Sequence, residues 1–391
     1  MQAEPFTINI PEEKLLDLQE RLRRINWAPD FSNEDWAYGV NGAYLRELAD
    51  YWLHEYDWPA HQSKMNLLAN FRVEIEGIPI HFVHERGKGP NPMPIILSHG
   101  WPWTYWDLRH VIGPLTDPAA HGGDPLDSFD VVVPSLPGYG FSTPLTQPGI
   151  NFWRTADLWN TLMQDVLGYE RFAAQGGDWG ALVTSQLGHK YADHLWGIHL
   201  TDAIKLDMFN HDRPWVLGDP GLVSMPPGAV RKTTLARLRN YSAHVAVQGL
   251  DPQTLSFMAH DSPIGLCAWI LERRRNWGDT NGDVESRFPK DDLLTTMMLY
   301  WATESFVTSV RFYYEAAWNP WSPSHSRTPV VEAPTGITFH GADAPNAPND
   351  EQRQYWNLHH WDRHPAGGHF APAEEPDAIV RGIRATFREL R

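Results

Sequence analysis

Apolar side chains recur at intervals of three and four through the first seventy residues, which is the spacing of one helix face. Pro11 is well placed to start a helix, because proline's fixed φ suits the first turn. The apolar positions are Leu15, Leu16, Leu18 and Leu22, then Tyr44, Leu45, Leu48 and Trp52. We therefore predict that this part of the chain is mostly helical, with one helix over 43–57.

From residue 71 the pattern changes to strands. Polar and apolar side chains alternate over 71–76 and again over 80–83, and the Gly-Ile-Pro turn between the two runs predicts a hairpin. Further short apolar runs, dense enough for buried strands, lie at 94–97, 129–133, 172–175, 196–200 and 337–339. A last helix is predicted around 375–389. Alternating strands and helices predict an α/β fold with a mainly parallel sheet covered on both faces.

The segment 205–320 interrupts this alternation. It combines helical spacing with many aromatic side chains and several prolines. A second core would also fit, but its position after the middle of a parallel sheet favours a helical lid. We therefore divide the chain into an N-terminal extension with the first hairpin (1–92), the first part of the core (93–204), the lid (205–320) and the second part of the core (321–391).

Composition excludes several classes of function. Of 391 residues, 42% are hydrophobic and 20% charged, as in ordinary globular proteins, and the net charge is −16. A nucleic-acid-binding protein would present a basic face, and docking on an anionic membrane is also disfavoured, so neither partner is expected. The single cysteine, Cys267, excludes an intramolecular disulfide and lies in an apolar run, where we expect a packed thiol.

Targeting signals and tryptophan content add two expectations. No run approaches the ~18 apolar residues of a membrane span, and the first residues carry acids and prolines that a signal peptide would lack. A cytoplasmic protein is therefore expected. The 19 tryptophans are bulky to bury and costly to expose, so they line a cavity under the lid or fill the core.

The most informative motif is QGGDWG at 175–180, between an apolar strand and a predicted helix. A nucleophile with small residues two positions before and two after it is the pattern of a nucleophile elbow, whose sharp turn pushes the central side chain out above the sheet. The central residue is Asp178. The alternative is a simple helix N-cap, but a cap does not need glycine on both sides.

An aspartate in this position restricts the chemistry. Serine or cysteine would indicate esters, amides or thioesters, whereas a carboxylate is suited to displacement at a strained or activated sp³ carbon, as in an epoxide or an alkyl halide. The product is an ester on the enzyme, which water must then cleave. That second step requires a base and a site that stabilises an oxyanion.

Candidates for the oxyanion site follow the strand at 94–97. In the sequence HGWPW at 99–103, a turn would aim the amide of Trp101 at the same point as the amide of Trp179, which follows the nucleophile. HG dipeptides are common, so an ordinary turn is the alternative. The combination with the elbow about 75 residues later is more specific than either motif alone.

The base is expected late in the chain, in the order nucleophile, acid, histidine. Among 19 histidines, His369 is preferred because it lies in a GGHF loop directly before the final helix. Asp343 follows the predicted strand 337–339, where a carboxylate can orient the imidazole and stabilise its charged form. Glu351 or Asp350 would be the alternatives for this role.

These motifs together resemble the microsomal-type epoxide hydrolases. The resemblance rests on the elbow, the HGWP turn, PGYGFS at 137–142 and GGHF at 367–370, and covers nearly the whole chain. PFTI at 5–8 and the segment 21–27 resemble the N-terminal extension that wraps the core in that family. The family's acid, seven residues past the glycine of a Pro-Thr-Gly turn, falls on Asp343, and the membrane anchor of the animal enzymes is missing, as in the soluble bacterial members.

The same resemblance implies residues that bind the substrate. The family holds and protonates the epoxide oxygen with two lid tyrosines, and one of them falls on Tyr313 of RFYYE. The other position is occupied by His244, so His244 donates in its place, Tyr241 one turn earlier reaches in, or Tyr313 acts alone. Further residues expected in the substrate pocket are Pro102, Trp103 and Tyr314. A narrower resemblance is to bacterial enzymes that open bulky aromatic epoxides in natural-product pathways, including those of enediyne antibiotics.

The resulting hypothesis is an epoxide hydrolase that forms a vicinal diol without a cofactor and takes an epoxide and water as its partners, with a homodimer as the expected assembly. A haloalkane dehalogenase with the same aspartyl ester is the nearest alternative, and a non-catalytic ligand-binding protein is an alternative of another class. A metal enzyme is disfavoured, because His359, His360 and His364 have no accompanying ligand motif, and surface histidines are expected there.

Overall fold

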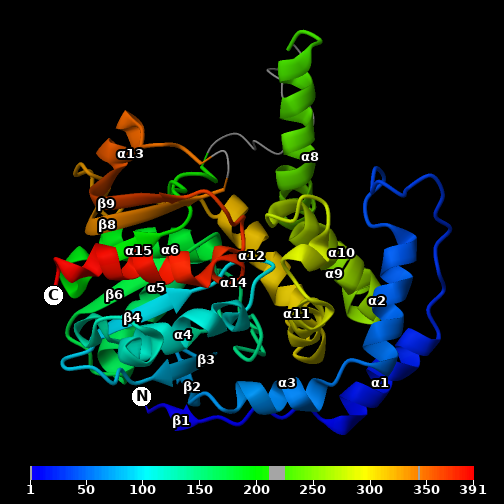
Figure 1. Cartoon of the computed structure of the whole chain (residues 1–391), viewed down its shortest axis with the longest axis horizontal. Coiled ribbons are helices and arrows are strands. Elements are labelled where there is room, and N and C mark those ends of the chain that lie inside the picture. Colours follow the sequence, from blue (N-terminus) through cyan, green and yellow to red (C-terminus); the bar gives the residue numbers. More distant parts are fainter. Residues whose placement is uncertain (1, 211–224, 342–343) are drawn as a thin grey trace.

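A sheet of nine strands forms the centre of the part of the chain that the structure describes. The structure is a computed structural model and describes residues 2–210, 225–341 and 344–391, and only the backbone of Arg237 and Tyr241. The strand order is β1-β2-β3-β5-β4-β6-β7-β8-β9 (Figure 1). The strands are β1 (Glu4–Pro5), β2 (Asn70–Ile75), β3 (Ile78–Glu85), β4 (Met93–Ser98), β5 (Phe129–Pro134), β6 (Phe172–Gly176), β7 (Leu195–Leu200), β8 (Val331–His340) and β9 (Trp356–His364).

The direction of the strands confirms the prediction of a mainly parallel sheet. From β5 through β9 all neighbours pair in parallel, whereas β1, β2, β3 and β5 pair antiparallel. The hairpin expected after residue 70 is formed by β2 and β3. Each of the other predicted strands is present as well, although β8 begins six residues earlier than its apolar run indicated.

Helices cover both faces of the sheet, as predicted. On one face lie α5 (Phe152–Thr161) and α6 (Trp179–Lys190), and on the other α4 (Arg109–Thr116) and α15 (Pro376–Arg388) (Figure 1). Two adjacent residues of β7 contact helices on opposite faces of the sheet. Ile198 packs against α6, and His199 packs against α15. Successive side chains of a strand point to opposite faces, so β7 is buried on both. The apolar runs of the parallel strands follow from this double coverage.

The segment between β7 and β8 contains a group of helices above one end of the sheet. They are α8 (Ala229–Leu250), α9 (Pro252–Asp261), α10 (Pro263–Trp277), α11 (Lys290–Ala302) and α12 (Phe306–Trp318). Part of α8 projects away from the other elements (Figure 1). The buried thiol of Cys267 lies in α10, and burial raises its pKa to about 12, so it is the packed thiol that the sequence predicted.

The N-terminal helices bind this group from outside. They are α1 (Glu12–Arg23), α2 (Gly42–His54) and α3 (Trp58–Met65). Both α1 and α2 contact α10, and α2 and α3 contact α11 (Figure 1). The hydroxyl of Tyr51 donates to Asp291 at 2.9 Å, and Arg21 pairs with Asp261 at 3.0 Å. Because these bonds join residues about 240 positions apart, the N-terminal extension fixes where the helices after β7 lie.

The last strand, β9, was not predicted. Its side chains alternate between half-buried and exposed, and most of them are polar, so no apolar run marks it. His359, His360 and His364 lie on this edge strand, where His364 approaches Glu375 at 3.1 Å. Within the described residues, no group of three or more histidine, cysteine or carboxylate side chains is placed to hold a metal ion.

Three further short elements lie in connections near the carboxyl ends of the strands or between the last strands. They are α13 (Asp350–Tyr355), which leads into β9, α14 (Ala371–Glu374), which precedes α15, and the 3-10 turn η1 (Tyr105–Leu108) after β4. None of the helices in the described part of the chain has the length and apolar character that crossing a bilayer requires.

Candidate active site

Asp178 lies in the sharp turn between β6 and α6, in the strained conformation that an elbow requires. Its φ is 53° and its ψ is −126°, a region that non-glycine residues rarely adopt. It occupies the N-cap position of α6 but makes no side-chain cap hydrogen bond, so the N-cap alternative is not supported. The carboxylate passes so close to Gly100 that a Cβ there would lie 2.3 Å from Oδ1. Close packing of this kind holds the strained turn in place.

Two groups from distant parts of the chain contact the Asp178 carboxylate. The backbone N–H of Trp101, in the turn after β4, donates to Oδ1 at 2.7 Å. On the other side, Nε2 of His369 lies 3.3 Å from Oδ2. Trp179 occupies the first position of α6, where a backbone N–H has no acceptor within the helix. The structure therefore brings together the predicted nucleophile, the predicted base and the first of the two predicted oxyanion donors.

The electrostatics of the pair favour a charged imidazole beside a carboxylate. Burial has the largest single effect on the pKa of His369 and lowers it, but the neighbouring carboxylate of Asp178 raises it, with further increases from Asp202 and Glu374. The net pKa lies above the ordinary value for histidine. Removal of the charge of Asp178 would therefore make the imidazole easier to deprotonate.

Aromatic rings and the end of α10 position the His369 loop. The imidazole meets Trp277 edge-to-face at 5.1 Å and Trp103 at 5.5 Å. The backbone N–H of His369 donates to the carbonyl of Trp277 at 2.9 Å. The carboxylate of Glu374 accepts the N–H groups of Gly368 and Phe370 on either side of His369. The base is thus fixed by contacts from the lid and from α14.

Tyr313 and His244 form a second buried polar pair. The tyrosine hydroxyl on α12 and Nε2 of His244 on α8 lie 3.2 Å apart. Burial raises the pKa of Tyr313 well above its usual value and lowers the pKa of His244 well below its own, so both are neutral near pH 7. His244 stacks on Trp101 with ring centroids 5.4 Å apart, and Tyr313 meets Trp179 edge-to-face at 4.6 Å. These ring contacts place the pair beside the residues that surround Asp178.

Other predicted residues have mixed outcomes. Trp103 is fully buried beside His369, and Pro102 is buried in the same turn. Tyr314, in contrast, is 40% exposed and packs on Trp318, and the structure does not bring it to the rings around Asp178, so its place in the pocket stays a prediction. Adjacent helical residues point about 100° apart. With Tyr313 facing inward, Tyr314 therefore faces outward.

Two predicted residues are not described. Asp343, the expected acid, and the side chain of Tyr241 lie outside the described residues. Of the alternatives for the acid, Glu351 pairs with Lys205, and Asp350 lies in the exposed first turn of α13.

Sequence reasoning missed Asp202 and Glu374, the two carboxylates that raise the pKa of His369 together with Asp178. Asp202 comes two residues after β7, at the carboxyl edge of the sheet, and this position was a usable signal.

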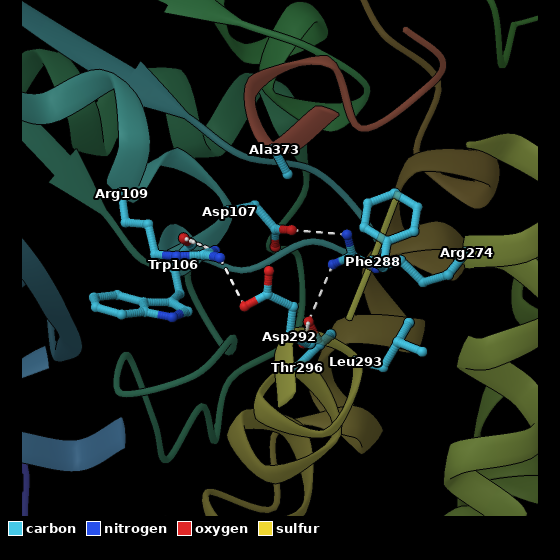
Figure 2. A pocket seen from close by; sticks show the side chains of 9 residues that line it. All are labelled: Trp106, Asp107, Arg109, Arg274, Phe288, Asp292, Leu293, Thr296 and Ala373. Carbon is cyan, nitrogen blue, oxygen red and sulfur yellow. Dashed lines mark hydrogen bonds and ion pairs between the residues drawn. The ribbon is translucent and has the colours of Figure 1, made fainter. Parts of the chain in front are cut away.

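Arg274 was also missed, and it joins the lid to the core beside this site. Its guanidinium approaches the buried carboxylate of Asp107 at 2.7 Å and lies over the ring of Phe370 at 4.1 Å. Figure 2 shows Arg274 reaching from α10 toward Asp107 and toward Thr296 of α11. It also donates to the carbonyl of Pro102, in the turn that carries the Trp101 amide, at 3.3 Å. One cation therefore connects the lid, the Trp101 turn and the neighbour of His369.

Comparisons with known proteins identify the family. A model described as the epoxide hydrolase N terminus matches residues 3–108, and one described as the alpha/beta hydrolase fold matches residues 93–376. Epoxide hydrolase 1 of Oryctolagus cuniculus is 34% identical over 97% of this chain and 87% of its own length. The chain belongs to the microsomal-type epoxide hydrolase family.

Further relatives agree with this assignment. A protein of Stigmatella aurantiaca whose name assigns it provisionally to the epoxide hydrolases is 38% identical over 99% of this chain and 85% of its own length. The crystal structure of juvenile hormone epoxide hydrolase from the silkworm Bombyx mori superposes with a TM-score of 0.81 at 28% identity, covering 100% of this chain and 94% of that one. The predicted α/β-hydrolase fold and the predicted epoxide hydrolase activity are thereby confirmed.

Removal of the Arg274 charge should destabilise this epoxide hydrolase strongly. Arg274→Met leaves the carboxylate of Asp107 buried and unpaired, so we expect a loss of about 3–5 kcal/mol in the free energy of unfolding, measured by urea titration. Arg109→Met is the matched control, because its partner Asp292 is 35% exposed and the loss should be about 1 kcal/mol or less. Equal losses in the two variants would contradict the assigned role of Arg274.

Proposed function

We propose that this epoxide hydrolase opens its substrate through a covalent ester on Asp178. The observation that supports this proposal is the position of the Asp178 carboxylate, which lies between the N–H of Trp101 at 2.7 Å and Nε2 of His369 at 3.3 Å. A carboxylate at the apex of an elbow is exposed for attack on carbon, and the N–H donor and the imidazole are those that the second step needs.

In the first step, an oxygen of Asp178 attacks a carbon of the epoxide ring while the bond from that carbon to the ring oxygen breaks. The ring oxygen takes a proton from the hydroxyl of Tyr313, whose pKa burial keeps high, so that the phenol is protonated at neutral pH. Nε2 of His244 lies 3.2 Å from the oxygen of Tyr313. In the proposed mechanism the hydrogen of His244 is on Nε2, so that it donates to this oxygen and stabilises the phenolate that forms. General acid catalysis of this kind suits a leaving oxygen that would otherwise depart as an alkoxide.

In the second step, water cleaves the ester. Once Asp178 is esterified its charge is gone, so the imidazolium of His369 gives up its proton to solvent. The neutral imidazole then takes a proton from water, whose oxygen attacks the carbonyl carbon of Asp178. The amides of Trp101 and Trp179 stabilise the tetrahedral oxyanion. Collapse of this intermediate breaks the bond from the carbonyl carbon of Asp178 to the substrate oxygen, which takes the proton from His369 and leaves as the vicinal diol. The carboxyl proton of Asp178 returns through solvent to the phenolate of Tyr313, which restores both the carboxylate and the phenol. Asp343 is proposed to orient His369 from behind, as the sequence predicted.

The substrate is proposed to be a bulky aromatic epoxide. Trp101, Trp179 and Trp277 contact Tyr313, His244 or His369, so indole rings surround the proposed reaction centre. Aromatic rings favour edge-to-face or offset contacts with one another, which suits an aromatic substrate. A natural-product epoxide, a cytoplasmic location and a homodimer stay predictions from the sequence.

The haloalkane dehalogenase alternative uses the same nucleophile but releases halide, which accepts hydrogen bonds from N–H groups and needs no proton. The hydroxyl of Tyr313, buried beside Trp179, favours a leaving oxygen instead. Assays for diol and for halide, with both substrate classes offered, distinguish the two activities.

Replacement of the base should trap the ester. His369→Gln should leave the first step in place and slow the second at least about a hundredfold. Incubated with styrene oxide, this variant should gain the mass of one substrate molecule, located by peptide mass spectrometry on the peptide that contains Asp178.

Asp178→Asn is the control and should form no adduct, provided that deamidation is excluded by mass. An adduct on another residue, or turnover by the intact asparagine variant, would contradict the proposed ester.

Loss of the Tyr313 hydroxyl should slow the first step alone. Tyr313→Phe should reduce the rate of ester formation by about 10²–10⁴-fold, the range typical of general acid catalysis, with the hydrolysis rate little changed. Stopped-flow tryptophan fluorescence under single-turnover conditions measures both rates. Tyr314→Phe is the matched control, because it changes the adjacent, outward-facing hydroxyl and should leave both rates unchanged. A normal rate of ester formation in Tyr313→Phe would exclude this tyrosine as the proton donor.

A further inference from the structure

We infer that Asp202 is a positioning residue that acts on both Asp178 and His369, an inference that rests on the proposed function of those two residues. Asp202 follows β7 by two residues and lies at the carboxyl edge of the sheet, where β6 also ends. Its Oδ2 accepts the backbone N–H of Asp178 at 2.9 Å. Asp202 therefore follows a different strand from the predicted nucleophile and acid. The predicted nucleophile follows β6, and the predicted acid follows β8 in the sequence.

The first part of this role concerns the shape of the elbow. Asp178 lies two residues beyond the end of β6 and has a positive φ, and its peptide N–H donates to the side chain of Asp202. Room for this contact exists because residue 177 is glycine, since a Cβ at Gly177 would lie 2.4 Å from Oγ1 of Thr201 and 3.1 Å from Oδ2 of Asp202. A hydrogen bond to a charged acceptor contributes more than one between neutral groups. Asp202 thus fixes the peptide plane from which the nucleophile projects.

The second part concerns the charge on His369. Among the described residues, the titratable groups that face the imidazole are Asp178 in the elbow, Asp202 after β7, Glu374 on α14 and His244 on α8. His340, at the end of β8, faces Asp202 as well. When Asp178 is esterified, its negative charge is lost, and Asp202 and Glu374 are the described carboxylates that still favour the imidazolium.

Of these two, Asp202 is the better placed to act in the second step. Glu374 is committed to backbone N–H groups of Asp279, Gly368 and Phe370 and therefore shapes the loop. Asp202 is bonded to the backbone of the residue that carries the ester. Its charge therefore stays next to the reaction centre after the first step, when the imidazole accepts a proton from water.

Two substitutions separate the two parts. Asp202→Asn keeps an oxygen acceptor for the N–H of Asp178 but removes the charge, whereas Asp202→Ala removes both. Asp193→Asn is the matched control, because Asp193 is an exposed carboxylate that precedes β7 at the opposite end of the same strand. Ester formation and ester hydrolysis are measured separately by single-turnover tryptophan fluorescence with styrene oxide, from pH 5 to 9.

Asp202→Asn should form the ester at the normal rate but hydrolyse it at least about tenfold more slowly. Without the nearby negative charge the pKa of His369 falls, so the acid-side limb of the hydrolysis profile should move to lower pH. Asp202→Ala should show the same hydrolysis defect and also form the ester more slowly. The control should match the unaltered enzyme throughout.

Normal rates and an unshifted pH profile in Asp202→Asn would overturn the inference. If the alanine variant does not fold, the asparagine variant alone decides the electrostatic part. The His369→Gln experiment distinguishes this inference from the proposed function. If only the role of Asp202 were wrong, His369→Gln would still accumulate the ester on Asp178.

Discussion

The structure depends on one constraint, which is that a carboxylate at the end of a buried strand must project outward from a sharp turn. The backbone of Asp178 adopts a positive φ, and its surroundings are tightly packed. A Cβ at Gly100 would clash with the carboxylate, and one at Gly177 would clash with Thr201. Strain of this kind costs about 1–3 kcal/mol and persists only where the surroundings impose it. The sheet, the Trp101 turn and the loop after β7 supply those surroundings.

The lid completes the site by placing groups that the sheet does not carry. Tyr313 and His244 come from α12 and α8, and the carbonyl of Trp277 at the end of α10 holds the backbone of His369. The buried pair of Arg274 and Asp107 ties this lid to the core. The N-terminal helices bind the lid from outside, so the extension contributes to the site through the elements that it positions.

Local motifs allowed much of this to be predicted. The elbow, the HGWP turn and the GGHF loop each have a short pattern with a steric or electrostatic reason, and the structure brings Asp178, Trp101 and His369 together. Arg274 acts through contacts with residues more than 160 positions away, and no short pattern marks such contacts. Asp202 had only its position after a predicted strand as a signal. The strand β9 escaped because its exposed polar side chains leave no apolar run. Tyr313 is buried and Tyr314 is exposed, because helical phase decides which of two adjacent tyrosines faces inward.

The central claim is that substrate carbon becomes bonded to Asp178 before water acts, and the fate of oxygen tests it most directly. A single turnover in ¹⁸O-labelled water, with enzyme in excess over epoxide, should give a diol without label, because its new oxygen comes from the carboxylate. The label should instead appear in the peptide that contains Asp178. Label in the diol of that first turnover would mean that water attacks the epoxide directly, and the account would be wrong.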